Sequence, residues 1–245
     1  MPMMKVTISA AMTVDGKIST AAGDSALSSR QDLRRVHALR AASDAVMVGI
    51  STVLADDPRL TVRLAKGRNP ARIIVDSTCR TPPQSRILRT ARKIRTIIAV
   101  TEKAPAANIV AAERAGAQVV TINSGGKGQV DLNALFARLE KETGFRKILV
   151  EGGGELNWSL LRLGLADELV VTVAPRIAGG RLATTLVEGD GFDAMSEGIK
   201  LKLIEADCLE ETGEVVLHYR VARNRRGRGG DGGGLFNACR GTESR

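Results

Sequence analysis

The sequence predicts an α/β fold in which helices flank a mostly parallel central sheet and a C-terminal antiparallel hairpin extends that sheet. Two observations lead to this prediction. Up to residue 175, short runs of β-branched and apolar residues alternate with segments of helical periodicity, which is typical of parallel strands joined by crossover helices. Residues 200–221 then show two runs of alternating polarity around Glu-Thr-Gly-Glu, the pattern of a hairpin.

The expected strands are short apolar runs, as is typical of strands that are covered on both faces. They span residues 5–14, 44–49, 71–77, 95–101, 118–122, 147–153 and 167–175. The dipeptide Asp15-Gly16 is a turn signal that ends the first of these strands, and Pro175 ends the last.

The expected helices carry apolar residues at intervals of three and four. They span residues 28–42, 108–117, 131–142 and 155–165, and residues 51–58 are expected to form a short turn or helix that Pro58 closes. Ser28 or Ser29 can cap the first helix, because a serine hydroxyl accepts a hydrogen bond from a free amide of the first turn.

The composition divides the 245-residue chain into a folded domain, residues 1–223, and a tail, residues 224–245. Hydrophobic residues make up 43% of the chain, which is ordinary for a globular protein with a full core. The tail is rich in arginine and glycine and lacks apolar periodicity. Because such a segment cannot bury enough apolar surface to offset its chain entropy, we expect it to be disordered.

The composition also argues against several classes of protein. The chain has no run of 18 apolar residues and its N-terminus turns polar too early for a secretory signal, so we expect no membrane span and a cytoplasmic location. Three distant cysteines and only two histidines predict no metal site. Aromatic residues make up 2%, which disfavours a base-stacking surface. The net charge of +9 suits small anions as well as polynucleotides, so we expect no nucleic-acid partner for the domain.

Polar or glycine-rich segments follow four of the expected strands. In an open α/β sheet, ligands bind at the carboxyl ends of the strands, so four such ends at one edge predict a binding site. The segments are Asp15-Gly16-Lys17, GISTVLADDP (49–58), Asp76-Ser77-Thr78 and Glu151 with the glycines after it.

The last of these segments joins a strand to a helix through three glycines, in LVEGGGELNWSLL (149–161). Glycines let the backbone approach a ligand closely, and free amides at a helix start favour phosphate. The dinucleotide fingerprint GxGxxG is not met, because Asn157 stands in place of its third glycine. By itself the turn is therefore as compatible with close packing as with a phosphate cradle.

Five stretches together resemble one protein family. They are SAAMTVDGKIS (9–19), RVHALRAASDAVMVGISTVLADDPRLTVR (35–63), PARIIVDS (70–77), ILVEGGGELNWSLL (148–161) and DELVVTVAPRIAGG (167–180). The family is that of the riboflavin-pathway pyrimidine reductases, which share the dihydrofolate reductase fold. The chain lacks the HxE and PCxxC motifs of the zinc deaminase that precedes bacterial members, so it resembles the stand-alone archaeal and fungal type.

The resemblance implies a reaction and its reactants. NADPH would reduce C1′ of the ribosylamino side chain of 2,5-diamino-6-ribosylamino-4(3H)-pyrimidinone 5′-phosphate to the ribitylamino product. A reductase of the same fold acting on the deaminated pyrimidine, a pteridine or a folate stays an alternative, and so does NADH as the coenzyme. An RNA-binding protein that uses the basic tail is a minor alternative of a different class.

The resemblance also implies roles for residues that match the motifs. The implied cofactor-binding residues are Ala11, Thr52, Asp56, Ser77, Gly153, Gly154, Glu155, Leu156 and Asn157. The implied substrate-binding residues are Asp24, Arg40, Leu60, Arg63 and Glu151. Reduction of a ring-opened imine needs a proton or charge support at nitrogen, and we assign this role to Lys17, with Glu151 as the second catalytic candidate.

Two further expectations concern partners and coenzyme choice. The family implies a homodimer, and the strand-rich segments 168–174 and 215–221 would otherwise be exposed sheet edges that template association. Arg80 and Arg86, in the loop after the third strand, are the candidates for contact with a 2′-phosphate that would distinguish NADPH from NADH.

Overall fold

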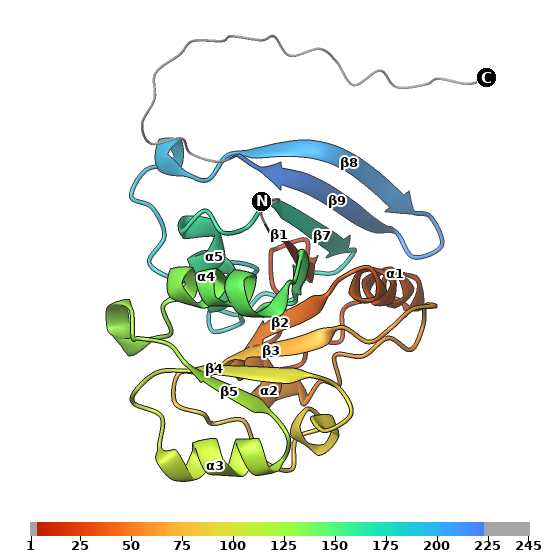
Figure 1. Ribbon diagram of the computed structural model, residues 1–245. Helices are drawn as coiled ribbons and strands as arrows, with labels where there is room; N and C mark the ends of the chain where they lie inside the picture. The colour runs from red at the N-terminus through yellow and green to blue at the C-terminus, as the bar shows by residue number, and fades with distance from the viewer. Residues whose placement is uncertain (1–3, 223–245) are drawn as a thin grey trace, which may run out of the picture.

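The computed structural model describes residues 4–222, which form a nine-stranded sheet with helices on both faces (Figure 1). The strand order is β5-β4-β3-β2-β6-β1-β7-β9-β8. The predicted disordered tail, residues 224–245, lies outside the described residues.

The predicted elements are present, with ends that differ by a few residues. The strands are β1 (Lys5–Thr13), β2 (Ala45–Gly49), β3 (Ala71–Val75), β4 (Thr96–Val100), β5 (Gln118–Thr121), β6 (Lys147–Val150), β7 (Glu168–Ala174), β8 (Leu201–Leu209) and β9 (Glu214–Val221). The helices are α1 (Arg30–Ala41), α2 (Ile50–Asp56), α3 (Ala106–Arg114), α4 (Leu132–Thr143) and α5 (Gly154–Arg162), with short 3₁₀ turns η1 (Leu88–Thr90), η2 (Gly126–Gly128) and η3 (Met195–Glu197). The segment expected to be a turn or helix is therefore a helix, α2.

The strand pairing confirms the predicted architecture. The strands from β5 to β7 pair in parallel, and β9 and β8 extend the sheet in antiparallel pairs. The expectation about the sheet edges was wrong. β7 pairs with both β1 and β9, and β9 pairs with both β7 and β8, so neither is an edge. The outer strands are β8 and β5, and β8 exposes apolar side chains such as Leu203 and Ile204.

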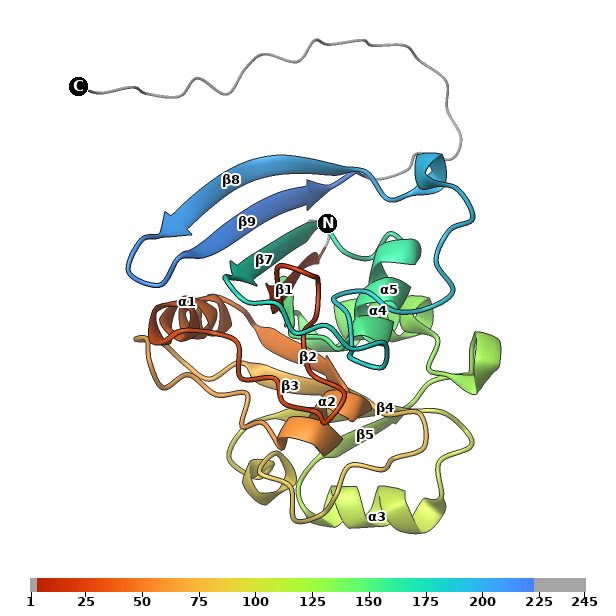
Figure 2. The same ribbon diagram turned by 180° about the vertical axis from the view of Figure 1, so that it is seen from behind.

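The core lies in two layers, one on each face of the sheet. On one face, α4 and α5 cover the apolar side chains of β1, β6 and the neighbouring strands. On the other face, α2, α3 and η1 cover the alternate side chains of β2, β3 and β4, and α1 adds Leu39. Figure 2 shows α1 and α2 on the side of the sheet opposite α4 and α5. Burial on both faces explains why the parallel strands are continuous apolar runs.

A buried arginine fixes the loop that follows β3. The guanidinium of Arg72 is fully buried and donates to the hydroxyls of Thr96 and Thr90 and to the carbonyl of Ile87 at 2.7–3.0 Å. Burial lowers the pKa of Arg72 to about 10, so the group stays cationic at neutral pH. Because a buried donor needs an acceptor, these bonds hold residues 87–96 against the sheet.

A second buried polar group ties the terminal hairpin to the start of α1. Ser29 is the N-cap of α1, as the sequence allowed, and its hydroxyl accepts from the amide of Asp32 at 3.1 Å. The buried carboxylate of Glu214, at the start of β9, accepts from the amide of Ser29 at 2.8 Å and from the hydroxyls of Ser29 and Thr212. The position of α1 against the sheet is thereby set by a strand from the far end of the chain.

Candidate active site

The four polar strand ends meet at one edge of the sheet. Their strands, β1, β6, β2 and β3, are neighbours and run in parallel, so their carboxyl ends lie side by side. The strand β1 is longer than its neighbour and continues through Thr13, five positions beyond the pair of Ile8 with Val150. The loop that carries Lys17 therefore projects past the level of Glu151.

A bidentate ion pair lies at the centre of this edge. Arg40, in the last turn of α1, donates through Nε and Nη2 to the two carboxylate oxygens of Glu151, each at 2.6 Å. Only 12% of the Arg40 side chain and 13% of that of Glu151 are exposed, so solvent screens the pair weakly. Nη1 of Arg40 also donates to the carbonyl of Thr61 at 3.1 Å. Three separate segments, α1, the end of β6 and the loop after α2, converge on one guanidinium.

The loop after α2 brings further positive charge to the pair. Its backbone turns through left-handed conformations at Asp57 and Leu60, and the side chain of Leu60 is buried in the core. Arg63 is exposed and donates through Nη1 to the hydroxyl of Thr61 at 2.7 Å. Partial burial and then the charges of Arg40, Arg59 and Arg86 lower the pKa of Arg63. This arginine cluster, made of Arg40, Arg59, Arg63 and Arg86, favours an anionic ligand.

The expected residues Asp24 and Asp56 are brought near one another by the loop before α1. The carboxylate of Asp56 accepts from the hydroxyl of Ser25 at 2.9 Å, and Asp24 accepts from the amide of Ala26 at 3.0 Å. Both acidic side chains are exposed. The loop therefore lies against the end of α2, beside the arginine cluster.

The glycine turn packs tightly against the protein itself. The hydroxyl of Thr52, in α2, accepts from the amide of Gly153 at 3.1 Å. A Cβ atom at Gly154 would lie 2.5 Å from Cγ of Glu188 and 2.7 Å from the carbonyl oxygen of Thr185. The close approach of residues 185–188 is therefore sufficient to require glycine at position 154.

Free amides remain at the same turn. No side chain caps α5, and the amides of Gly154, Glu155 and Leu156 have no acceptor within residues 4–222. The helix α2 likewise begins without a side-chain cap. The start of α5 thus directs unpaired amides and partial positive charge toward the carboxyl edge.

A pocket of about 620 Å³ opens where these two helices begin. The expected residues Ser77, Glu155 and Leu156 line this pocket, and so does Arg80. Arg86 lies elsewhere, because its amide and side chain engage Asp57. The pocket is thus next to, and distinct from, the Arg40 and Glu151 pair.

The remaining expected residues lie around this centre rather than in it. Ala11 is within β1, and the half-buried Lys17 donates through Nζ to the carbonyl of Ala183 at 3.4 Å. Asn157 is buried, and its amide donates to the carbonyl of Leu186 at 2.9 Å while its Oδ1 atom has no partner within the described part of the chain. Within residues 4–222 the Nζ atom of Lys17 bonds to Ala183 rather than to Glu151, so the two catalytic candidates do not form a bonded pair.

Two further residues of this centre, His37 and Thr61, were not among the residues expected in the site. His37 is buried, and its Nδ1 atom accepts from the amide of Arg63 at 2.7 Å. Thr61 accepts from both Arg40 and Arg63. The available signal was the position of His37 three residues before Arg40, on the same face of a helix.

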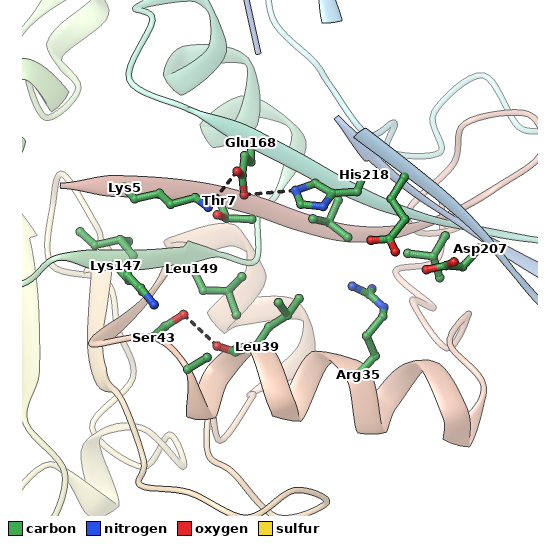
Figure 3. Close-up of a pocket in the computed structure, with 15 residues that line it drawn as sticks. Lys5, Thr7, Arg35, Leu39, Ser43, Lys147, Leu149, Glu168, Asp207 and His218 are labelled. Carbon is green, nitrogen blue, oxygen red and sulfur yellow. Dashed lines mark hydrogen bonds and ion pairs between the residues drawn. The ribbon is translucent and has the colours of Figure 1, made fainter. Parts of the chain in front are cut away.

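A second pocket, of about 470 Å³, lies at the opposite end of the parallel strands (Figure 3). Lys5, Lys147 and Glu168, which begin β1, β6 and β7, line it with Arg35 and His218. Burial raises the pKa of Glu168, but hydrogen bonds from Lys5 and His218 outweigh this and lower it. The Nε2 atom of His218 lies 3.1 Å from a carboxylate oxygen of Glu168, a contact that is an ion pair only when the imidazole is protonated. Charges of both signs partner one another here, which distinguishes this pocket from the cationic carboxyl edge.

Residues 4–222 hold neither a cluster of metal-ligating side chains nor a membrane-spanning helix. No group of three or more histidine, cysteine or acidic side chains could hold a metal ion there. No helix in that range is long and apolar enough to cross a membrane.

The chain is similar to proteins of one family. The family model of the RibD C-terminal domain matches residues 4–216. A 2,5-diamino-6-ribosylamino-4(3H)-pyrimidinone 5′-phosphate reductase of Methanothermobacter thermautotrophicus is 48% identical over 219 residues, which cover 88% of this chain and 97% of that protein. The protein of the same name from Archaeoglobus fulgidus is 39% identical and covers 85% of this chain and 94% of its own.

Solved structures agree with the fold. Acinetobacter baumannii RibD superposes with a TM-score of 0.76 at 26% identity, over 91% of this chain and 59% of that longer protein. The yeast riboflavin biosynthesis reductase Rib7 superposes with a TM-score of 0.70 over 91% of each chain, and at 23% identity it shows the fold alone. The dihydrofolate reductase-like α/β fold expected from the resemblance is confirmed.

The packing at Gly154 predicts the effect of adding one methyl group. Gly154→Ala should lower the free energy of unfolding by about 2 kcal/mol, because the new Cβ overlaps the backbone of Thr185. Urea unfolding measures the change. Gly126→Ala is the matched control, because a Cβ there meets nothing within 4 Å, and it should change stability by less than about 0.5 kcal/mol. Equal stability of the two variants would contradict the packing explanation.

Proposed function

The chain belongs to the family of the RibD C-terminal domain, and from that premise we propose that it reduces 2,5-diamino-6-ribosylamino-4(3H)-pyrimidinone 5′-phosphate to the ribitylamino product in riboflavin biosynthesis. The observation that carries the proposal is the ion pair of Arg40 with Glu151, which lies with Arg63 beside a pocket at the carboxyl edge of the sheet. Relatives that bear this substrate in their name are 48% and 39% identical to the chain.

The arginine cluster suits the phosphate of the substrate. A guanidinium presents its N–H groups in a planar fork that matches two phosphate oxygens. Arg40 already uses three nitrogens on Glu151 and Thr61, so Arg63, which is exposed, is the more available donor. We assign Arg63 to direct phosphate contact, and Arg40 to the positive field and to holding Glu151.

The carboxylate of Glu151 suits the ring-opened end of the substrate. An iminium carbon accepts hydride more readily than a neutral imine, and a fixed negative charge nearby stabilises the iminium. The bidentate bond to Arg40 orients both oxygens of Glu151, so the carboxylate need not reorganise when the substrate binds.

The pocket between α2 and α5 suits a nicotinamide coenzyme. When bound, such a coenzyme supplies the hydride. The unpaired amides of Gly154, Glu155 and Leu156 suit a diphosphate, since amides at a helix start bind anions. Thr52 holds the amide of Gly153 within this turn. We further propose NADPH rather than NADH, because Arg80 lines the pocket and can pair with a 2′-phosphate.

The test is a turnover assay that compares substrates and coenzymes. Absorbance of the reduced coenzyme should fall when the protein meets NADPH and the diamino substrate, and kcat/KM should be higher than with the deaminated pyrimidine or with NADH. Faster turnover of the deaminated compound would assign the chain to the alternative substrate. No oxidation of either coenzyme with any of these pyrimidines would exclude the proposed reaction.

Lys17 is the proposed source of proton or charge support. Its loop is fixed by the bond from the Thr13 amide to the Lys17 carbonyl at 2.8 Å and by the carboxylate of Asp15. Hydrogen bonds from the Thr13 side chain and from the amides of Ala178 and Gly179 lower the pKa of Asp15 to about 2. Lys17→Met should lower kcat by about tenfold or more with little change in KM, because proton transfer matters in the transition state. Lys141→Met, an exposed control on α4, should leave both unchanged. Equal kcat in the two variants would remove Lys17 from the mechanism.

We also propose a homodimer that forms through the edge strand β8. Within residues 4–222 no strand pairs with the outer edge of β8, and such an edge with exposed Leu203 and Ile204 favours pairing with a second copy of itself. Sedimentation equilibrium should show a dimer, and Leu203→Lys should shift it toward monomer, because a charge on an edge strand opposes pairing. Val110→Lys, at an equally exposed apolar residue of α3, is the control. A monomeric wild-type protein would rule out the dimer.

The expectations about RNA and location stay predictions. The RNA-binding alternative depended on residues 224–245, which lie outside the described part of the chain. The cytoplasmic location is consistent with a substrate of an intermediary pathway, and fractionation of cells that express the tagged chain would test it.

A further inference from the structure

A buried histidine supports the loop that presents Arg63. His37 lies in the third turn of α1 and is 2% exposed. Its Nδ1 atom accepts from the amide of Arg63 at 2.7 Å and from that of Leu64 at 3.3 Å. An imidazole nitrogen that accepts two amides carries no proton, so the neutral ring with its proton on Nε2 is the form that makes these contacts.

The contacts of His37 belong to a small network that sets the spacing of two arginines. Arg40, one helical turn beyond His37, donates to the carbonyl of Thr61 at 3.1 Å, and Arg63 donates to the hydroxyl of the same threonine at 2.7 Å. Residues 61–64 are therefore attached to α1 at both ends of the segment, by Arg40 and by His37. Asn69 adds one bond, to the amide of Val62 at 2.8 Å.

The charges around His37 favour its neutral form. Burial, then the charges of Arg40 on α1 and Arg63 on the loop, lower the pKa of His37, and Glu151 at the end of β6 opposes them. If the ring were protonated, Nδ1 could no longer accept from the two amides, and a third positive charge would lie beside two guanidinium groups. The neutral ring can hold the loop without competing with the arginines for an anion.

We propose that His37 is a positioning residue of the phosphate subsite, whose Nδ1 atom holds the backbone at Arg63 so that the Arg63 guanidinium lies beside Arg40. The proposal rests on the proposed function, because it takes the 5′-phosphate as the group that these arginines bind. Its role is geometric, so loss of the acceptor should weaken binding of the phosphorylated substrate more than it slows hydride transfer.

Two substitutions separate positioning from packing. The Oδ1 atom of asparagine can take the place of imidazole Nδ1, whereas leucine fills the same space without an acceptor. His37→Leu should raise KM for the pyrimidine phosphate by about tenfold, with kcat and KM for NADPH within about threefold of wild type. His37→Asn should restore KM for the pyrimidine phosphate to within about threefold of wild type. Arg34→Leu, at an exposed position of α1, should behave as wild type.

A binding measurement keeps this test separate from that of the reaction. Ribose 5-phosphate titrated calorimetrically should bind wild type and His37→Asn alike and bind His37→Leu about tenfold more weakly. If wild type turns over but His37→Leu keeps its substrate KM, the positioning role is overturned. If both His37 variants show the same fall in kcat, the same rise in both KM values and the same fall in thermal stability, the role of His37 is packing, and the positioning role is overturned. If wild type binds ribose 5-phosphate in a His37-dependent way but oxidises no NADPH, the proposed reaction fails and the subsite stands.

Discussion

The candidate site depends on one ion pair, that of Arg40 with Glu151. The two side chains are 111 positions apart and come from α1 and the end of β6. The two side chains are buried to about the same degree, and the charge of each offsets the free-energy cost of removing the other charge from water. Because the pair also binds Thr61, it fixes the loop that carries Arg63. Loss of either partner would therefore displace three segments and leave a charge unpaired.

The glycine turn has two physical roles that its sequence does not separate. Gly154 must lack a side chain because residues 185–188 pack on it, whereas the unpaired amides beyond it remain available to an anion. The segment that packs on this turn also requires a glycine, because a Cβ at Gly189 would lie 2.0 Å from the ring of Trp158. Tight packing on one side of the turn holds the amides in place on the other, so the proposed anionic ligand would meet amides that are already positioned.

Much of the fold follows from local patterns. Apolar runs and helical periodicity predict the strands and helices to within a few residues, because both faces of each central strand are buried and the pattern is strong. The edges of the sheet could not be predicted this way, since a period of two is the same in β9 as in β8 and pairing partners are distant in sequence. For the candidate site, the motifs around Arg40, Thr52 and Glu151 select the candidate residues, but neither their partners nor the acceptor role of His37 follows from the local sequence.

The sequence by itself determined the elements, their order and the polar and glycine-rich segments at the ends of strands, because these depend on residue type and local spacing. Only the tertiary structure decided that Arg40 pairs with Glu151, that His37 accepts from the amide of Arg63 and that Arg80 rather than Arg86 lines the pocket. Those choices depend on contacts between segments up to 111 residues apart. Such contacts form only when the sheet order and the packing of α1 are set, and no local pattern encodes them.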